Sequence, residues 1–588
     1  MVGGWWLSKL IWFTPVNINH FYDRIFVRYG ISDPQLLSRL RILERFGLNF
    51  HNDDLTDSSD AFLLKHLKKA ESELKILRSY KRSKQTPSQL LTTDMLTWFL
   101  ELILEGRSYI HNVYAINPLF GTQNELPAFM IQIHPLKGLR DARYYLVRLS
   151  KFKHKFHQIL RGLETRAQKG IYPPKVIIDS VVRQMKAFIA SPPEKNVLYT
   201  HFSKKITPIK MSPQRRQEFH NLAKKHIENA VYPSYRKLIT HFKRIRPKAP
   251  TAVGLWKQPN GPGFYRFLLK LFTTTEYTPE QLHQLGLKEV KRIQSLMSKI
   301  FAKVGIKGPF SGALLQKLSK QSRFLYPNND RGRRQCIEDY KTIVAEMRKQ
   351  IPKYFDLEKL DPLDIKRTPI FKEQTAPGAQ YLPPAMDGSR PGIFYANLRD
   401  MRNIPKFGMR TLAYHEAIPG HHLQLATQFQ LKGVPIFRKV APFTGFIEGW
   451  GLYAETLAWE MGFHKTPYDR IGRLQAELFR AVRLVVDTGM HHKRWSRQQA
   501  IQYMQHNTGM ARKDVITEID RYIVLPGQAC AYKVGEIALL KLRRKAKKAL
   551  GKQFNLKAFH TQLLKNGAVP LIFLERIIDA YINKEKGL

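Results

Sequence analysis

Apolar residues recur at helical spacing through most of this chain, and no other feature constrains its fold as strongly. Strand-like stretches are few and short. With 588 residues, of which 43% are hydrophobic, the chain can bury a large core. We therefore predict a mainly α-helical protein with two large helical lobes flanking a cleft. The segments that carry the helical period are 36–46, 62–77, 93–110, 139–165, 217–242, 279–304 and 335–350.

The segment YHEAIPGHHLQ at residues 414–424 places three histidines around one glutamate. In many metallopeptidases a histidine, the glutamate after it and a second histidine on the same helical face hold zinc and set a general base beside the activated water. The candidates here are His415, Glu416 and either His421 or His422. A lone His-Glu pair is usually surface chemistry, so further ligands are needed to support a metal site.

The spacing of these histidines differs from the common pattern, in which two ligands lie four residues apart on one helical face. On an unbroken helix, His415 and His421 would point roughly 120° apart, while His422 would lie about 10 Å along the axis. Pro419 cannot donate the helical hydrogen bond, and Gly420 tolerates unusual backbone angles. We therefore expect a two-residue bulge that lets His421 act as the second ligand, with His422 as the alternative.

A third ligand is expected downstream, in the helical-looking segment FIEGWGLYAE at residues 446–455. Glu448 is the candidate, because two imidazoles and one carboxylate with an open fourth position form the ligand set of many zinc peptidases. Glu455 follows seven residues later on the same helical face, where it could orient a ligand. Together these residues predict one zinc ion per chain.

Four motifs in this order carry a family resemblance: YHEAIPGHHLQ at 414–424, EGWGLYAE at 448–455, DTGMHHKRW at 487–495 and LPGQACAYKVGE at 525–536. The segment DGSRPGIFYANLRD at 387–400 also fits. The chain resembles the domain-of-unknown-function 885 family, whose members are similar to zinc metallopeptidases of the gluzincin type. The resemblance implies a metallopeptidase-like fold in one family domain over about residues 17–585. It also favours His421 over His422 as the ligand.

Two further pairs of residues are candidates for roles in catalysis or binding. Asp487 and His491 lie four residues apart and form either a local helix pair or a catalytic pair, in which the carboxylate orients an imidazole that donates to the developing oxyanion. Tyr532 and Lys533 follow a turn-like Pro-Gly element. By analogy, the phenol could stabilise the tetrahedral intermediate and the lysine could hold a substrate carboxylate. The alternative for Tyr532 is a half-buried packing role.

Residues 387–397 have the pattern of a turn followed by a short strand, directly before the zinc helix. We therefore expect a small β-sheet beside that helix. As an edge strand, this segment could pair with an extended peptide through main-chain hydrogen bonds, with Asn397 among the substrate-binding residues. An ordinary strand in a small sheet is the compatible alternative.

The expected organisation is an apolar segment at residues 1–16, a helical lobe at 17–375 and a zinc-binding catalytic lobe at 376–588. The apolar segment is too short to span a bilayer, and no small-residue cleavage site follows it. A cytoplasmic location is therefore favoured, with export or membrane association as alternatives. Cys336 and Cys530 are far apart in the sequence and decide little about the compartment.

The chain is strongly basic, with 97 Lys and Arg against 47 Asp and Glu and a formal net charge of +50. The basic clusters fall in several helical-looking segments rather than in one tail or nucleic-acid module. We therefore expect a solvated surface with no specific nucleic-acid partner and at most weak binding to anionic surfaces. The sequence leaves the oligomeric state open.

The function predicted from these residues is a zinc-dependent hydrolase of peptide bonds in short peptides, an oligopeptidase or carboxypeptidase-like enzyme. Glu416 would take a proton from the attacking water and deliver it to the leaving amine. One alternative is a zinc-dependent amidohydrolase that acts on a non-peptide amide. Another is a non-catalytic polyanion- or membrane-binding protein with a relict site, which the intact Glu416 argues against.

Overall fold

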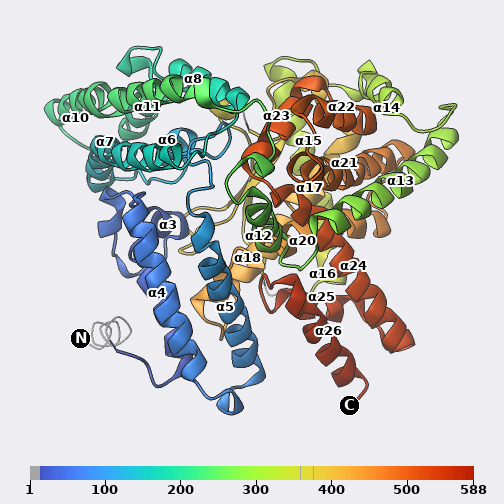
Figure 1. Cartoon of the computed structure of the whole chain (residues 1–588). Coiled ribbons are helices and arrows are strands. Elements are labelled where there is room, and N and C mark those ends of the chain that lie inside the picture. Colours follow the sequence, from blue (N-terminus) through green and yellow to red (C-terminus); the bar gives the residue numbers. More distant parts are fainter. Residues whose placement is uncertain (1–12, 358, 375, 588) are drawn as a thin grey trace. The chain divides into compact units, whose positions relative to one another are not determined.

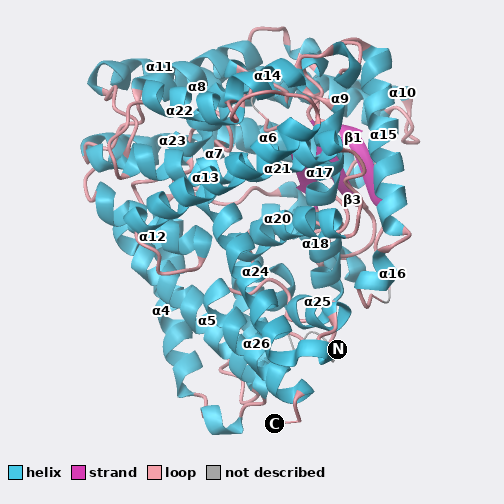
Figure 2. Ribbon diagram, turned by 90° about the vertical axis from the view of Figure 1, so that its right-hand side faces the viewer, coloured by secondary structure: helices cyan, strands magenta, loops and turns pink. Residues whose placement is uncertain are grey.

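The computed structural model of this protein describes residues 13–357, 359–374 and 376–587. The fold is mainly α-helical with one small sheet, as predicted (Figures 1 and 2). Contacts divide the chain into two compact units. Unit 1 comprises Met1–Ala252, Lys257–Gly261 and Ala385–Asp387, and unit 2 comprises Val253–Trp256, Pro262–Pro384 and Gly388–Leu588.

Within the described residues, the regular elements of unit 1 are all helices. The predicted helix at 36–46 is interrupted at Arg41, whose φ of 55° is left-handed and ends a short helix. The predicted helix at 217–242 contains a π-helical turn at Ile227–Val231. The α-helices are α2 (Ile18–Gly30), α3 (Pro34–Leu40), α4 (Asp60–Ser79), α5 (Pro87–Glu105), α6 (Thr122–Gln132), α7 (Leu139–Gln168), α8 (Lys175–Phe188), α9 (Val197–Ile206), α10 (Pro213–His226) and α11 (Tyr232–Ile245).

Unit 2 contains the predicted metal-binding motifs and the sheet. Its first helices are α12 (Gly261–Thr273), α13 (Pro279–Lys303), α14 (Gly312–Ser319), α15 (Asp330–Arg348) and α16 (Ile351–Tyr354). After the strands come α17 (Lys406–Glu416), α18 (His421–Gln430), α19 (Ile436–Val440), α20 (Thr444–Glu460), α21 (Pro467–His491), α22 (Arg497–Thr508), α23 (Arg512–Val524), α24 (Ala531–Leu550), α25 (Leu556–Leu564) and α26 (Leu571–Glu585).

The sheet has three strands, β1 (Leu363–Arg367), β2 (Ala379–Leu382) and β3 (Gly392–Ala396), in the order β1-β3-β2. It lies beside α17, as predicted (Figure 2). β3 pairs in parallel with β1 and antiparallel with β2. The expectation that the segment before α17 forms an edge strand is therefore wrong. Both edges of β3 are already paired, so it has no free main-chain groups for a peptide.

The boundary predicted at residue 375 differs from the boundary between the compact units, which falls near residues 252–262. The helices expected at the end of an N-terminal lobe pack in unit 2 instead. Gly286 of α13, for example, lies so close to α21 that a Cβ there would come within 2.8 Å of Leu484 Cβ. The observed boundary differs from the predicted one because helices that lie about two hundred residues apart in the sequence pack against each other.

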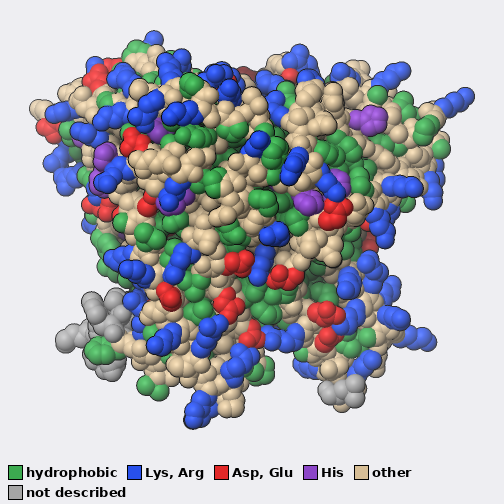
Figure 3. Space-filling model, in the orientation of Figure 1, with side chains coloured by type: hydrophobic (Ala, Val, Ile, Leu, Met, Phe, Trp, Pro, Cys, Tyr) green, Lys and Arg blue, Asp and Glu red, His purple; other side chains and the backbone are tan. Residues whose placement is uncertain are grey.

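Residues 1–12 of the predicted apolar segment lie outside the described part of the chain. In the described part, no single helix has the length and apolarity to cross a membrane, while one bent pair, Arg512–Val524 with Gln528–Gln553 at 113°, passes that test by length and composition. On the face shown in Figure 3, Lys and Arg side chains are spread over many elements rather than gathered in one patch.

Candidate metal centre

The predicted zinc motif folds as two helices separated by a short break. α17 ends at Glu416 and α18 begins at His421, with residues 417–420 between them. This differs from the predicted bulge within one helix. Gly420 makes the tight connection possible, because a Cβ there would lie 1.9 Å from the carbonyl oxygen of His415. His415 thus lies in the last turn of one helix and His421 at the start of the next.

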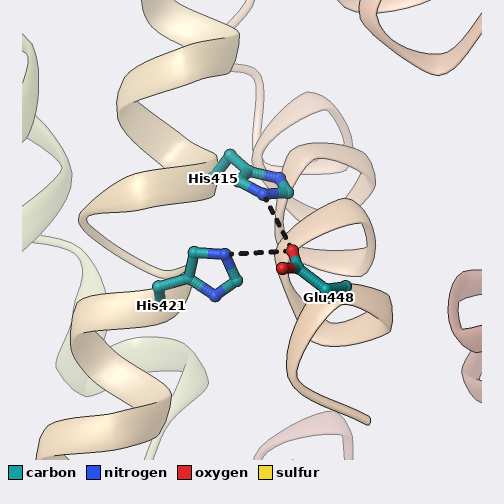
Figure 4. Close-up of side chains that lie close together, drawn as sticks. All are labelled: His415, His421 and Glu448. Carbon is teal, nitrogen blue, oxygen red and sulfur yellow. Dashed lines mark ion pairs between the residues drawn. The ribbon is translucent and has the colours of Figure 1, made fainter. Parts of the chain in front are cut away.

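Three ligand-type side chains converge at this break (Figure 4). His421 Nε2 lies 3.3 Å from Glu448 Oε2, and His415 Nε2 lies 3.7 Å from the same oxygen. All three potential ligand atoms lie within 4.8 Å of one another. The two histidines are buried, and the Glu448 side chain is 16% exposed. The structure therefore brings together the three residues that were predicted as metal ligands.

A carboxylate behind His415 fixes the orientation of this imidazole. His415 Nδ1 donates to Glu455 Oε1 at 2.8 Å, and Arg480 Nη2 lies 3.3 Å from that oxygen. With Nδ1 held by Glu455, Nε2 is the nitrogen that faces Glu448. The ring also lies against Gly451 of α20, where a Cβ would come within 2.6 Å of His415 Cε1. Glu455 thus has the orienting position predicted for it.

Burial and neighbouring charges shift the pKa values of this cluster. Burial disfavours the imidazolium of His415, but the neighbouring carboxylates of Glu448 and Glu455 outweigh it and raise the pKa to about 9. Burial also disfavours the ionised carboxylate of Glu448, but the two imidazoles hold its pKa well below the ordinary value. For Glu416 burial prevails and raises the pKa, partly offset by the same imidazoles. Glu416 therefore binds a proton more readily than an ordinary glutamate does, whereas Glu448 binds one less readily.

His422 lies outside the cluster, although it follows His421 directly. Its Nε2 donates to the carbonyl oxygen of Asp361 at 2.9 Å, and its Nδ1 lies 2.9 Å from the Tyr381 hydroxyl. Burial lowers the pKa of this imidazole to about 4, so the ring is neutral and both nitrogens have protein partners. Between the two alternatives left by the sequence, the geometry brings His421 to the site and keeps His422 in the packing beside β2.

A cavity of about 380 Å³ in unit 2 adjoins the cluster. His415, Glu416 and Glu455 line it, and so does Tyr532. The Tyr532 ring lies nearly parallel to that of His415, with centroids 6.2 Å apart. The Tyr532 hydroxyl accepts a hydrogen bond from Arg521 at 3.1 Å. Glu416 and Tyr532 therefore reach the same cavity, as their predicted roles require.

The structure does not bring His491 to this cavity. Its Nδ1 accepts from the backbone N–H of Leu255 at 3.1 Å, and its Nε2 donates to the carbonyl oxygen of Tyr522 at 3.0 Å. Asp487 does not orient it, because that carboxylate accepts from the Tyr265 hydroxyl and the Gly527 N–H. The predicted Asp-His catalytic pair is therefore wrong, and both side chains are packing residues.

The two residues predicted to bind substrate are also held by the protein itself. Lys533 is 1% exposed, does not line the cavity, and donates to Glu477 at 2.7 Å and to Glu536 at 2.6 Å. Its predicted contact with a substrate carboxylate is therefore wrong. Asn397 does line the cavity, but its side-chain amide donates to three carbonyl oxygens at residues 373–377. Its role there is to hold the loop that precedes β2.

Sequence reasoning missed three buried arginines in the cavity wall, Arg480, Arg483 and Arg521. The first two lie on α21, and the other buried residues between positions 478 and 486 of this helix are apolar. An arginine on the apolar face of an amphipathic helix is a signal that could have found them, because such a charge is rarely buried without a partner or a function.

Comparisons with known proteins agree with this architecture. The family model described as "bacterial protein of unknown function (DUF885)" matches residues 43–578. The crystal structure of a candidate lipoprotein from Colwellia psychrerythraea matches with a TM-score of 0.90 and 32% identity, over 96% of this chain and 99% of that one. A candidate lipoprotein of unknown function from Shewanella oneidensis shares the fold, with a TM-score of 0.70, 16% identity, and coverage of 96% and 100%. No curated protein matches.

Proposed function

This chain belongs to the DUF885 family of bacterial proteins of unknown function, and we propose that it is a zinc-dependent peptidase that hydrolyses short peptides. The observation that carries the proposal is the convergence of His415, His421 and Glu448 next to a cavity that His415 and Glu416 line. A carboxylate next to a metal-ligand cluster, facing a space for substrate, is the arrangement that hydrolysis of an amide requires.

The donor set fits zinc. Two ligand atoms that share a tetrahedral zinc at about 2.0–2.1 Å lie roughly 3.4 Å apart, close to the separations of 3.3 and 3.7 Å found between the imidazoles and Glu448. Glu448 Oε2 is buried and has no hydrogen-bond donor among the described residues, so a cation would satisfy it. Glu455 supplies the support from behind His415 that zinc-bound imidazoles usually have.

Zinc held by His415, His421 and Glu448 would polarise the scissile carbonyl and lower the pKa of a water molecule. Glu416 takes one proton from the attacking water as the new C–O bond forms. It then gives that proton to the amine nitrogen as the C–N bond breaks, so the water is divided between the two products. The raised pKa of the buried Glu416 suits this exchange, because a base must hold the proton before returning it.

Tyr532 would assist from the wall of the same cavity. Its ring lies against His415, and its hydroxyl hydrogen remains free for a second partner because the bond from Arg521 is accepted by the oxygen. A phenol in this position donates to the carbonyl oxygen as negative charge develops on it. The cavity of about 380 Å³ is of the size that holds a small ligand, which favours short peptides.

The proposal is tested by replacing Glu416 with glutamine, which is similar in size but cannot accept the proton. We expect wild type and Glu416→Gln both to retain about one zinc per chain in metal analysis. In a digest of a short-peptide library, the variant should be slower by a factor of about 10²–10⁴. Full activity of Glu416→Gln would contradict the mechanism. Turnover of simple amides without turnover of any peptide would favour an amidohydrolase.

A second pair of variants tests the choice of ligand. His421→Ala should lose zinc, whereas His422→Ala should keep it, because only the first imidazole faces Glu448. Inductively coupled plasma mass spectrometry on dialysed protein measures both. The two residues are neighbours in the chain and both are buried, so each serves as the control for the other. The reverse result would make His422 the ligand.

A further inference from the structure

Three buried arginines lie in the cavity wall beside the metal cluster. Arg480, Arg483 and Arg521 are each less than 10% exposed. Among the described residues, their ion-pair partners are two carboxylates, Glu455 and Glu518. A buried guanidinium is costly unless it is paired. Three guanidinium groups that share two carboxylates in the wall of a cavity therefore favour an anionic ligand.

Two of these arginines have N–H groups to spare. Hydrogen bonds account for two of the five N–H groups of Arg521, both on Nη2, to Gln528 and Tyr532. Its Nη1 approaches Glu518 only at 3.8 Å. Arg480 donates one hydrogen bond, from Nη1 to the carbonyl oxygen of Ala476, and its Nη2 lies 3.3 Å from Glu455. In the described part of the chain, neither Nε has a partner.

Arg483 differs from the other two, because the protein already holds its guanidinium in place. Its Nε donates to the Tyr522 hydroxyl and its Nη2 to Glu518, both at 2.9 Å. The guanidinium carbon also lies 4.5 Å from the centre of the Tyr532 ring. This arginine therefore supports the wall, while Arg480 and Arg521 are the two that can bind a ligand.

A single side chain lies between each of these two arginines and His415 of the metal cluster. Arg521 bonds to Tyr532, whose ring stacks on His415, and Arg480 contacts Glu455, which holds the same imidazole. A carboxylate bound here would lie within one or two residues of a peptide bond at the cluster. The anion that a short peptide always carries at that distance is its own terminal carboxylate.

We propose that Arg480 and Arg521 bind the free terminal carboxylate of the peptide substrate, so that the enzyme removes one or a few residues from carboxyl ends. The inference rests on the proposed function for the cleavage itself. Recognition of the carboxylate is a separate property, which binding measurements detect without turnover. Guanidinium groups suit this role because their N–H groups match the two oxygens of a carboxylate.

The test measures peptide binding to the zinc-loaded Glu416→Gln protein by isothermal titration calorimetry. The probes are trialanine, its carboxyl-terminal amide, and the same amide with glutamate as the last residue. We expect trialanine to bind at least about tenfold more tightly than either amide, since a charge-assisted contact of 1.4 kcal/mol gives that factor. Equal affinities for all three probes would overturn the proposal. Tight binding of the glutamate amide alone would do the same, because it would assign the arginines to an acidic side chain.

The variants then identify the residues. Arg521→Gln in the same background should reduce the affinity for trialanine to that for its amide and leave the amide unchanged. Arg402→Gln is the matched control, because Arg402 also lines the cavity but is largely exposed and paired with Asp400. It should change neither affinity. An unchanged preference for trialanine in both Arg521→Gln and Arg480→Gln would contradict the assignment.

Two results separate this inference from the proposed function. Preference for the free carboxylate without hydrolysis by the wild type would support the binding site and contradict the peptidase. Hydrolysis of peptides with a free carboxyl end and of their carboxyl-terminal amides at equal rates would support the peptidase and contradict the carboxylate site. If Arg521→Gln does not fold, as judged by circular dichroism, the comparison of the three probes on the parent protein decides the question alone.

Discussion

Asp487 shows how strongly burial can change a single carboxyl group in this protein. Its Oδ1 accepts from the Tyr265 hydroxyl at 2.6 Å, and the Gly527 N–H lies 3.0 and 3.1 Å from its two oxygens. No cation pairs with it among the described residues. Burial therefore raises its pKa to about 7, although these hydrogen bonds oppose the shift.

This shift predicts a pH dependence of stability. The pKa of Asp487 is higher in the folded protein than its value of about 3.9 in the unfolded protein. At a pH between these two pKa values, the folded protein therefore binds a proton that the unfolded protein does not. The stabilising contribution is complete below about pH 4 and is lost as the pH rises through about 7. Relative to Asp487→Asn, wild type should gain roughly 2–3 kcal/mol in free energy of unfolding between pH 8 and pH 5. Urea unfolding at each pH measures it, and a constant difference would contradict the shift.

The convergence of single side chains was predictable where residue type and spacing determine it. His415, Glu416 and Glu448 are of that kind, and the geometry agrees with the predicted cluster. The position of His491 was not predictable. Its two nitrogens bond to backbone groups of residues 255 and 522, and the helical pattern around His491 does not reveal these distant partners. For Lys533, the partner Glu477 lies 56 residues away on another helix.

At the scale of elements, the helical period located most helices, and local backbone chemistry explains where it failed. The break between α17 and α18 was expected from Pro419 and Gly420, but its size was not, because the chain leaves the helix for four residues. β3 was recognised as a strand, whereas its central position depends on β1 and β2. Pairing partners are set by tertiary structure, so the sequence of one strand cannot identify an edge.

The close approach of α20 to α17 predicts a sensitive position. Gly451→Ala would place a Cβ 2.6 Å from His415 Cε1, so the imidazole must move away from Glu448. We expect the zinc affinity to fall by a factor of about 10–100, similar to the loss of a supporting contact. Gly408→Ala on α17 is the control, since a Cβ there meets nothing within 4 Å. It should keep its zinc and be up to about 1 kcal/mol more stable. Competition with a fluorescent chelator measures both affinities, and equal values would contradict the argument.

At the scale of the whole molecule, the chain divides into two compact units whose bounds differ from the predicted lobes at 17–375 and 376–588. The boundary near residues 252–262 is set by packing between helices that are far apart in the sequence, such as α13 and α21. Every residue of the metal cluster and of the cavity wall belongs to unit 2. The consequence is that zinc should stabilise one unit directly.

Hydrogen exchange tests this expectation. At a zinc concentration one hundred times the dissociation constant, binding stabilises the protein that holds it by about 2.7 kcal/mol, which slows exchange through unfolding roughly a hundredfold. We expect this slowing in peptides from α17, α18 and α20 of unit 2, and no change in peptides from α7 of unit 1. Glu448→Gln should abolish it. Uniform slowing across α7 and α17 would contradict the assignment to unit 2.

The interruption between α17 and α18 bears on how related proteins are found. When both histidines lie on one helix, the 3.6-residue repeat fixes the interval between them. Here they lie on different helices, so the interval of six residues is set by the connecting turn and is independent of that repeat. Pattern searches of genomes that demand an interval of four residues would miss this chain. Allowing a proline and a glycine inside a longer interval would recover chains of this kind.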